Sequence, residues 1–253
     1  MASPIGKVLA ELPIEDLRKK DGGAWNLQKP INWKLSSVAE FQGAPALRVF
    51  YQKNSGTSND PGVGGLGISA VPRGLPSEAA VVEFQVFFDK GWHFSRGGKI
   101  GGFHIGHGEA SGYRHSDTGS SHRIMWQSSG GAISYVYPPS NLRQKLPELV
   151  AEGHGCGFFK DEFPAGALRV GAWNTVRLGV KLNSFEPGGK PRADGEALLE
   201  INGTAATQGR IRWRRAADLD ISAFEFGTFF GGPNPAVCDC TAYYKGFKLL
   251  QWK

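Results

Sequence analysis

The sequence lacks long hydrophobic runs and has few cysteines. No apolar stretch among its 253 residues is long enough to span a bilayer, and Met1 to Pro4 begin no hydrophobic signal core. The three cysteines, Cys156, Cys238 and Cys240, are an odd number, which excludes a framework in which every thiol pairs within the chain. A disulfide from Cys156 to one of the other two stays open. No second Cys/His pair follows at zinc-finger spacing, so we expect no metal site.

Acidic residues are absent from the most informative stretch of the chain. No Asp or Glu lies between Ser121 and Pro138, and Glu83 stands alone in its segment. This disfavours a glycoside hydrolase, which needs two carboxyl groups, one on each side of the scissile bond. Lys and Arg outnumber Asp and Glu by 29 to 23, a net charge of +6, and such an excess favours an acidic partner. Polyuronate, nucleic acid and an anionic surface all fit the charge alone.

Glycine and proline, in contrast, are plentiful, with 36 and 15 copies. They separate short segments rich in β-branched and aromatic residues, a pattern typical of strands and turns. Such segments include 46–51, 80–87, 172–183 and 197–203. The one segment that suggests a helix is 14–20, which Gly22 and Gly23 follow. We predict an all-β fold, a single-domain jelly roll or antiparallel β-sandwich with a concave substrate-binding sheet over residues 31–253, preceded by an N-terminal extension over residues 1–30 that holds the short helix.

Two neighbouring segments, 121–126 and 135–137, read as strands. Residues 128–131 between them, Ser-Ser-Gly-Gly, are turn formers, which predicts an antiparallel hairpin with its turn centred near Ser129. Side chains alternate across a strand, so every second residue shares a face with its neighbours. We therefore expect this hairpin to place several polar side chains in one patch.

With the turn at this position, Arg123 lies opposite Tyr135 and Ser121 lies opposite Tyr137. A guanidinium, a hydroxyl and two phenols would then share one patch, which suits an anionic sugar. Each residue also has a plainer explanation, because an arginine can form a structural ion pair and strand tyrosines often pack over a sheet. The arginine, however, is expected to project away from the apolar side of its strand, and two phenols facing a guanidinium favour a binding patch.

The order of these residues resembles polysaccharide lyase family 14, the alginate and glucuronan lyases of algal viruses and herbivorous molluscs. The resemblance runs from about Leu47 to the C-terminus and rests on Gly-Gly-Lys at 97–99, the Ser-x-Arg and Tyr-x-Tyr strands, and Thr-Phe-Phe-Gly-Gly at 228–232. It implies a jelly-roll lyase with five catalytic residues: Lys99, Ser121, Arg123, Tyr135 and Tyr137. The chain departs from the family pattern at 100–102, where Ile-Gly-Gly replaces Leu-Pro-Gly, and in the loop 106–119.

The activity that the resemblance implies is β-elimination, which removes the proton on C5 of a uronate and expels the glycosidic oxygen at C4. Charge develops beside a carboxylate, so positive groups or strong donors must neutralise that carboxylate. Arg123 can hold it with two parallel hydrogen bonds, and Ser121 or Lys99 can complete the shell. A phenol near cations can remove the proton and return it to the leaving oxygen. We predict Tyr137 in this role, with Lys99 as the rival base and Tyr135 as a positioning partner.

Further basic residues are weaker candidates for substrate binding. His104 and His107 belong to a glycine-rich segment that can line a substrate groove. Arg210, Arg212 and Arg214 alternate, so on a regular strand they would share one face that either binds a neighbouring uronate or is simply solvated. The predicted substrate-binding set is Arg48, His107, Arg210 and Arg212.

Functions of different classes stay open at this point. We predict a polysaccharide lyase that cleaves a glucuronan- or alginate-type polymer. A lectin-like jelly roll that binds anionic polysaccharide without cleaving it fits the same fold, because fold does not determine function. Glycoside hydrolysis comes third, and nucleic-acid binding, which has no accompanying motif, comes last. We further predict a monomer that needs no cofactor, binds neither nucleic acid nor membrane, and acts outside the cell or on cell walls, with no signal peptide in this chain.

Overall fold

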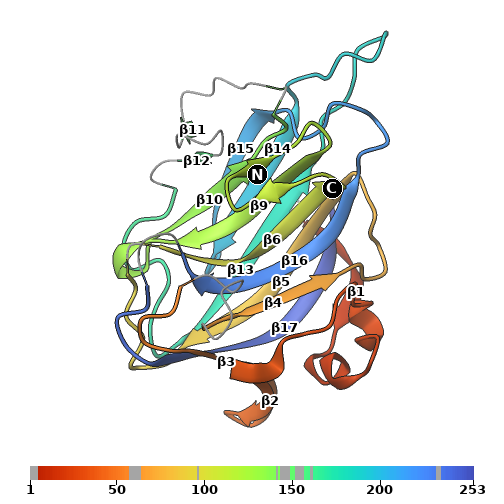
Figure 1. The fold of residues 1–253 in the computed structure, drawn as a ribbon. Helices are drawn as coiled ribbons and strands as arrows, with labels where there is room; N and C mark the ends of the chain where they lie inside the picture. The colour runs from red at the N-terminus through yellow and green to blue at the C-terminus, as the bar shows by residue number, and fades with distance from the viewer. Residues whose placement is uncertain are drawn as a thin grey trace.

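The computed structural model describes residues 5–56, 64–95, 97–140, 142, 149–151, 157–159, 162–231 and 235–253. In this part of the chain, two antiparallel sheets pack face to face (Figure 1). The larger sheet contains β1 (Ile5–Leu12), β2 (Ser36–Phe41), β3 (Ala44–Tyr51), β5 (Ala79–Phe88), β13 (Trp173–Lys181), β14 (Gly195–Ile201), β15 (Thr204–Ile211) and β17 (Cys240–Trp252). The smaller sheet contains β4 (Leu66–Ala70), β6 (Gly98–Gly106), β9 (Gly119–Trp126), β10 (Ala132–Tyr137), β11 (Leu149–Ala151), β12 (Gly157–Phe159) and β16 (Ile221–Phe230).

The strand order confirms the predicted all-β sandwich. The larger sheet runs β15-β14-β13-β5-β17-β3-β2, with β1 added along β17, and the smaller sheet runs β11-β12-β10-β9-β6-β16-β4. A short ribbon of β7 (Ala110–Ser111) and β8 (Arg114–His115) stands apart from both. Neighbouring strands in each sheet often come from distant parts of the chain, so residues far apart in sequence meet on one face.

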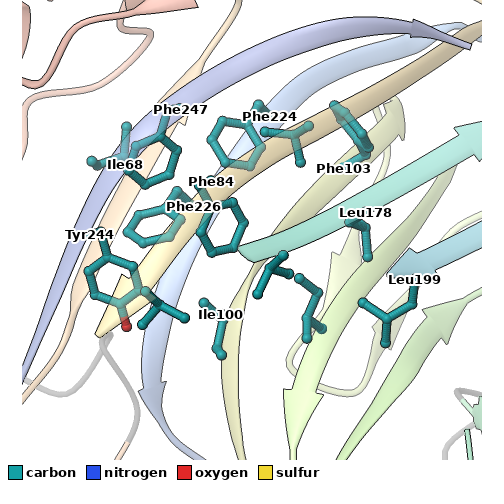
Figure 2. Packing of buried hydrophobic residues seen from close by; sticks show 14 of the residues in the cluster. Ile68, Phe84, Ile100, Phe103, Leu178, Leu199, Phe224, Phe226, Tyr244 and Phe247 are labelled. Atoms are coloured by element: carbon teal, nitrogen blue, oxygen red, sulfur yellow. The ribbon is translucent and has the colours of Figure 1, made fainter. Parts of the chain in front are cut away.

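The core lies between the two sheets and follows the alternation that the sequence predicts. In β13, Val176, Leu178 and Val180 are fully buried on the inner face. Aromatic rings fill the centre, where Figure 2 shows Phe84 from the larger sheet beside Phe226 from the smaller one. Their ring centroids lie 5.8 Å apart at an interplanar angle of 80°, an edge-to-face contact. Burial of each such side chain contributes about 2–3 kcal/mol to the stability of the folded chain. The packed core therefore fixes the positions of the strands, and with them the side chains on their outer faces.

The N-terminal residues pack directly on the sandwich. Residues 5–12, placed in that extension from the sequence, form β1 and pair with the last strand, β17. The predicted helix at 14–20 is a shorter 3-10 helix, η1 (Ile14–Arg18), whose Ile14 and Leu17 are buried in the core. It follows Pro13, which has no backbone N–H to donate. The domain boundary at residue 30 stays a prediction.

Two further sequence expectations concern cysteines and membrane helices. Cys238 and Cys240 are free thiols, and burial raises the pKa of Cys240, whereas Cys156 lies outside the described residues. None of the helices among the described residues has both the length and the apolar character needed to cross a membrane.

Candidate active site

The hairpin that the sequence predicts is present, with the predicted register. Arg123 is the Cα partner of Tyr135, and Ser121 is the partner of Tyr137, on the antiparallel strands β9 and β10. The short 3-10 turn η4 (Ser128–Gly130) joins the strands, and Ser129 has φ 58° inside it. Gly130 follows at φ 79°, where a Cβ would approach Leu168 O to 2.2 Å, so a glycine is required.

Strand β6 brings Lys99 to the other side of β9. Lys99 is the Cα partner of Met125, and Gly102 is the partner of Arg123, with an irregularity in the register between the two pairs. This bulge at Ile100 and Gly101 adds a residue to the strand. As a result Lys99 lies on the outer side, together with Arg123, while Ile100 is fully buried in the core.

These strands define an outer surface that we call the site face: the side of the smaller sheet turned away from the larger one. Residues that flank its members in sequence, such as Ile124, Val136 and Phe103, are buried in the core, so alternation directs the members outward. The site face comprises Ser69, Lys99, Gly102, His104, Ser121, Arg123, Met125, Tyr135, Tyr137 and Glu225.

Lys99 and the two tyrosines form the centre of the site face. The Lys99 Nζ lies 4.4 Å from the ring centroid of Tyr135 and 5.5 Å from that of Tyr137. The two rings lie 5.4 Å apart, and the side chains are almost fully buried. An ammonium group this close to aromatic faces is attracted by the ring quadrupole, and the same positive charge would stabilise a phenolate. The sequence connected Lys99 to the two tyrosines only through the family resemblance, and the structure brings these three side chains together.

The loop between β6 and β9 covers part of this centre. The Tyr113 N–H donates to the Tyr137 hydroxyl oxygen at 3.5 Å, and the His115 ring lies 5.2 Å from the Tyr137 ring. Ser121 Oγ is fully buried and donates to the carbonyl oxygen of Ala110 at 2.7 Å. The Ser121 hydroxyl therefore anchors this loop; its predicted contact with a substrate carboxylate stays a prediction.

Arg123 reaches across β6 rather than projecting straight outward. Its Nη1 donates to the backbone oxygen of Glu225 on β16 at 3.1 Å, and Gly102 lies in register between the two. A Cβ at Gly102 would approach His122 O to 1.9 Å, so only glycine fits there. Burial lowers the pKa of Arg123, while Glu225 and Tyr137 favour the charged form. An arginine stays protonated in proteins, so the site face holds a fixed positive charge.

The two histidines of the glycine-rich segment differ in position. His104 is half-buried on the site face as the Cα partner of Ser121, whereas His107 is exposed at the start of the covering loop. Burial and the nearby charge of Arg123 lower the pKa of His104, which therefore stays neutral at neutral pH. The predicted role of His107 in substrate binding stays a prediction.

The structure does not bring the predicted substrate-binding arginines to the site face. Arg48 lies on β3 of the larger sheet, between the core residues Leu47 and Val49, so it faces outward on the opposite side of the sandwich. Arg212 Nε donates to the carbonyl oxygen of Pro191 at 3.3 Å, next to the edge strand β15. Arg48 therefore belongs to the larger sheet, and Arg212 directly follows the edge strand of that sheet.

Arg210, Arg212 and Arg214 do not share a face either, which corrects the expected alternation. Arg210 is exposed with φ 63°, and β15 ends at Ile211, so the two-residue period is lost. Arg214 is buried at 3% exposure, where it pairs with Asp220 at 3.1 Å. The run of arginines thus combines an exposed residue near the end of β15 with a structural ion pair.

Two residues of the site face, Glu225 and Ser69, were not predicted from the sequence. Glu225 lies in register with Gly102 on one side and with Ser69 on the other, and Ser69 Oγ donates to Glu225 Oε1 at 2.7 Å. The available signal was a lone acidic residue between two phenylalanines of β16. Among the described residues, no group of three or more His, Cys, Asp or Glu side chains could hold a metal ion.

Known proteins share both the sequence pattern and the fold. The family model described as Polysaccharide lyase 14 matches residues 39–247. The solved structure of alginate lyase vAL-1 from Chlorella virus is 48% identical and covers 97% of this chain and 100% of that chain, with a TM-score of 0.90. The marine PL-14 alginate lyase from Aplysia kurodai has the same fold, at 23% identity and a TM-score of 0.75, covering 99% of this chain and 100% of that chain.

A curated relative extends well beyond this chain. Exolysin of Paramecium bursaria Chlorella virus 1 is 30% identical in an alignment of 208 residues, and the match covers 71% of this chain. The match covers 30% of Exolysin, so the chain spans less than a third of that relative. The similarity therefore concerns one part of the viral protein.

Proposed function

Because the chain belongs to polysaccharide lyase family 14, we propose that it cleaves a uronate polymer of the alginate or glucuronan type by β-elimination, leaving an unsaturated sugar. The observation that carries this proposal is the cluster of Lys99 with Tyr135 and Tyr137, beside the guanidinium of Arg123. The 48% identity to an alginate lyase over nearly the whole chain supports the same activity.

Arg123 neutralises the uronate carboxylate in this proposal. Removal of the C5 proton builds negative charge next to a group that is already negative, so a fixed positive charge stabilises the transition state more than the ground state. Arg123 has one guanidinium nitrogen anchored on Glu225 O, which holds the remaining donors in a fixed direction. A guanidinium can then bind the carboxylate through parallel hydrogen bonds.

Tyr137 transfers the proton. The adjacent ammonium of Lys99 and the guanidinium of Arg123 stabilise its phenolate, which removes the proton from C5. The electron pair of the broken C–H bond forms the C4–C5 double bond, and the glycosidic oxygen leaves with the proton that Tyr137 returns. Lys99 is the alternative base, because its Nζ lies on the same site face, and Tyr135 holds the ammonium through its ring.

The test is incubation with a panel of polyuronates while ultraviolet absorbance is followed. Elimination creates a double bond conjugated with the carboxylate, which neither hydrolysis nor binding produces. Absorbance should rise with at least one uronate polymer and stay flat with neutral polysaccharides. Depolymerisation without any absorbance change would establish a hydrolase, and binding without depolymerisation would establish a lectin.

We also propose that the chain acts as a monomer on anionic polysaccharide of cell walls, without nucleic acid or membrane as a partner. The resemblance to viral proteins and the net charge of +6 support this setting. Sedimentation at several protein concentrations tests the monomer, and release of soluble unsaturated sugars from isolated walls tests the location of the substrate.

A further inference from the structure

Glu225 introduces a negative charge into a face that otherwise carries Lys99 and Arg123. It is the sole acidic residue in strands β4, β6, β9, β10 and β16. Phe224 and Phe226 on either side of it are fully buried in the core, so alternation directs Glu225 to the site face. A carboxylate in a site for a polyanion opposes binding through like-charge repulsion, so its presence calls for a specific role.

The negative charge of Glu225 attracts the positive charge of Arg123, but among the described residues its carboxylate forms no hydrogen bond or ion pair with the guanidinium. Arg123 Nη1 donates to the backbone oxygen of Glu225, and the carboxylate Oε1 instead accepts from Ser69 Oγ at 2.7 Å. Oε2 accepts no hydrogen bond from any residue in the described part of the chain. An ionised carboxylate offers about four acceptor positions, so Glu225 retains acceptor capacity for a ligand.

Register places Glu225 in one row with the proposed active site. Consecutive Cα partners across five neighbouring strands are Tyr135, Arg123, Gly102, Glu225 and Ser69. Because neighbouring strands lie about 4.8 Å apart, the backbones of Arg123 and Glu225 are separated by about 10 Å. Gly102 places no side chain between them. The Arg123 guanidinium crosses Gly102 toward Glu225 O, so a polysaccharide lying along this row with one carboxylate on the guanidinium would set an adjacent sugar near the Glu225 side chain.

We propose that Glu225 recognises the sugar next to the one whose carboxylate Arg123 holds, an inference that rests on the proposed lyase function. The Glu225 carboxylate accepts hydrogen bonds from the ring hydroxyls of that neighbouring sugar and keeps its carboxylate away from the sheet. In a 1,4-linked polymer of two-fold ribbon shape, successive units turn opposite edges to a surface. A unit that directs its carboxylate at Arg123 is thus followed by one that directs hydroxyls at Glu225. Hydrogen bonds from hydroxyls to a carboxylate are short and strong.

The experiment compares the unmodified chain with Glu225→Ala and Glu225→Gln on two substrates: a polyuronate, and the same polymer after O-acetylation of its ring hydroxyls. Glu186→Gln, an exposed glutamate between β13 and β14, controls for the loss of one negative charge. Since a hydrogen bond to a charged group corresponds to roughly tenfold or more in affinity, Glu225→Ala should lose about that factor in kcat/KM on the unmodified polymer. Its loss on the acetylated polymer should be much smaller.

Two results would overturn the inference. One is an equal loss on both polymers, which would show that Glu225 acts only by positioning Arg123, and the other is no loss in either variant. The nearly isosteric Glu225→Gln keeps the test valid if the alanine variant fails to fold. If the unmodified chain forms no unsaturated product, the lyase proposal itself fails. Binding of the two polymers to the same variants then still decides whether Glu225 recognises hydroxyls.

Discussion

Replacing Arg123 with lysine should lower kcat/KM for a polyuronate by roughly 30- to 1,000-fold. The guanidinium crosses Gly102 to reach Glu225 O at 3.1 Å and still has nitrogen donors for a substrate. A lysine keeps the charge but offers one compact ammonium group, so it cannot make this anchor and a two-point grip on a carboxylate together. Losing a hydrogen bond from a charged group costs about 1.5–3 kcal/mol. Losing a preorganised stabiliser of the transition state costs about 3–4 kcal/mol. A range of about 2–4 kcal/mol gives the stated factor.

The assay is the initial rate of absorbance increase at several polymer concentrations, with thermal unfolding measured on the same samples. The reasoning requires that kcat falls along with any rise in KM, because the grip is strongest when charge develops in the transition state. A variant that unfolds at the unmodified temperature and keeps kcat/KM within about threefold would refute the proposed role of Arg123, since that factor corresponds to less than about 1 kcal/mol.

Three further substitutions test the proton-transfer residue, the anchor of the covering loop and a buried histidine. Tyr137→Phe removes only the phenolic oxygen, so turnover should collapse while polymer binding persists. If Tyr137→Phe instead kept near-normal turnover and Lys99→Ala folded but was inactive, Lys99 would be the base. Ser121→Ala removes the bond to Ala110 O, so proteolysis of the loop 106–119 should accelerate, and an unchanged cleavage rate would contradict the anchoring role. His122 is fully buried, and burial lowers its pKa from 6.5 to about 3, so between these values only the unfolded chain binds the proton. The free energy of unfolding should therefore fall as the pH drops below 6.5, by about 2 kcal/mol at pH 5. Urea unfolding of His122→Gln should show a smaller fall over the same pH range, and an equal fall in both proteins would refute the prediction.

Local sequence determined the hairpin of the proposed active site. Alternation along β9 and β10 and a turn of serines and glycines were enough to pair Arg123 with Tyr135, and the structure has this register. Both signals act over a few residues, and a register slip of one would have moved the buried Ile124 to the outer face. The all-β class followed from the same short-range pattern.

Alternation failed where the backbone departs from a regular strand. Arg210 has φ 63° and β15 ends one residue later, so the three arginines that alternate in sequence point to different surroundings. In β6, a bulge at Ile100 and Gly101 instead added a residue to the site face, because it brought Lys99 to the outer side of the strand. Such departures depend on pairing with neighbouring strands, which the residues themselves do not reveal.

Only the tertiary structure decided which strands share a sheet. Alternation shows that Arg48 faces outward, but strand pairing places it on the larger sheet, away from Lys99. Pairing likewise joins β1 to β17 and sets Glu225 between Gly102 and Ser69. These contacts join residues more than one hundred positions apart along the chain, for example Ser69 and Glu225 at a separation of 156. The free energy that stabilises these long-range contacts comes from burying apolar surface between the two sheets. The short-range pattern therefore determined the strands and the hairpin, and the packed sandwich determined the rest of the site.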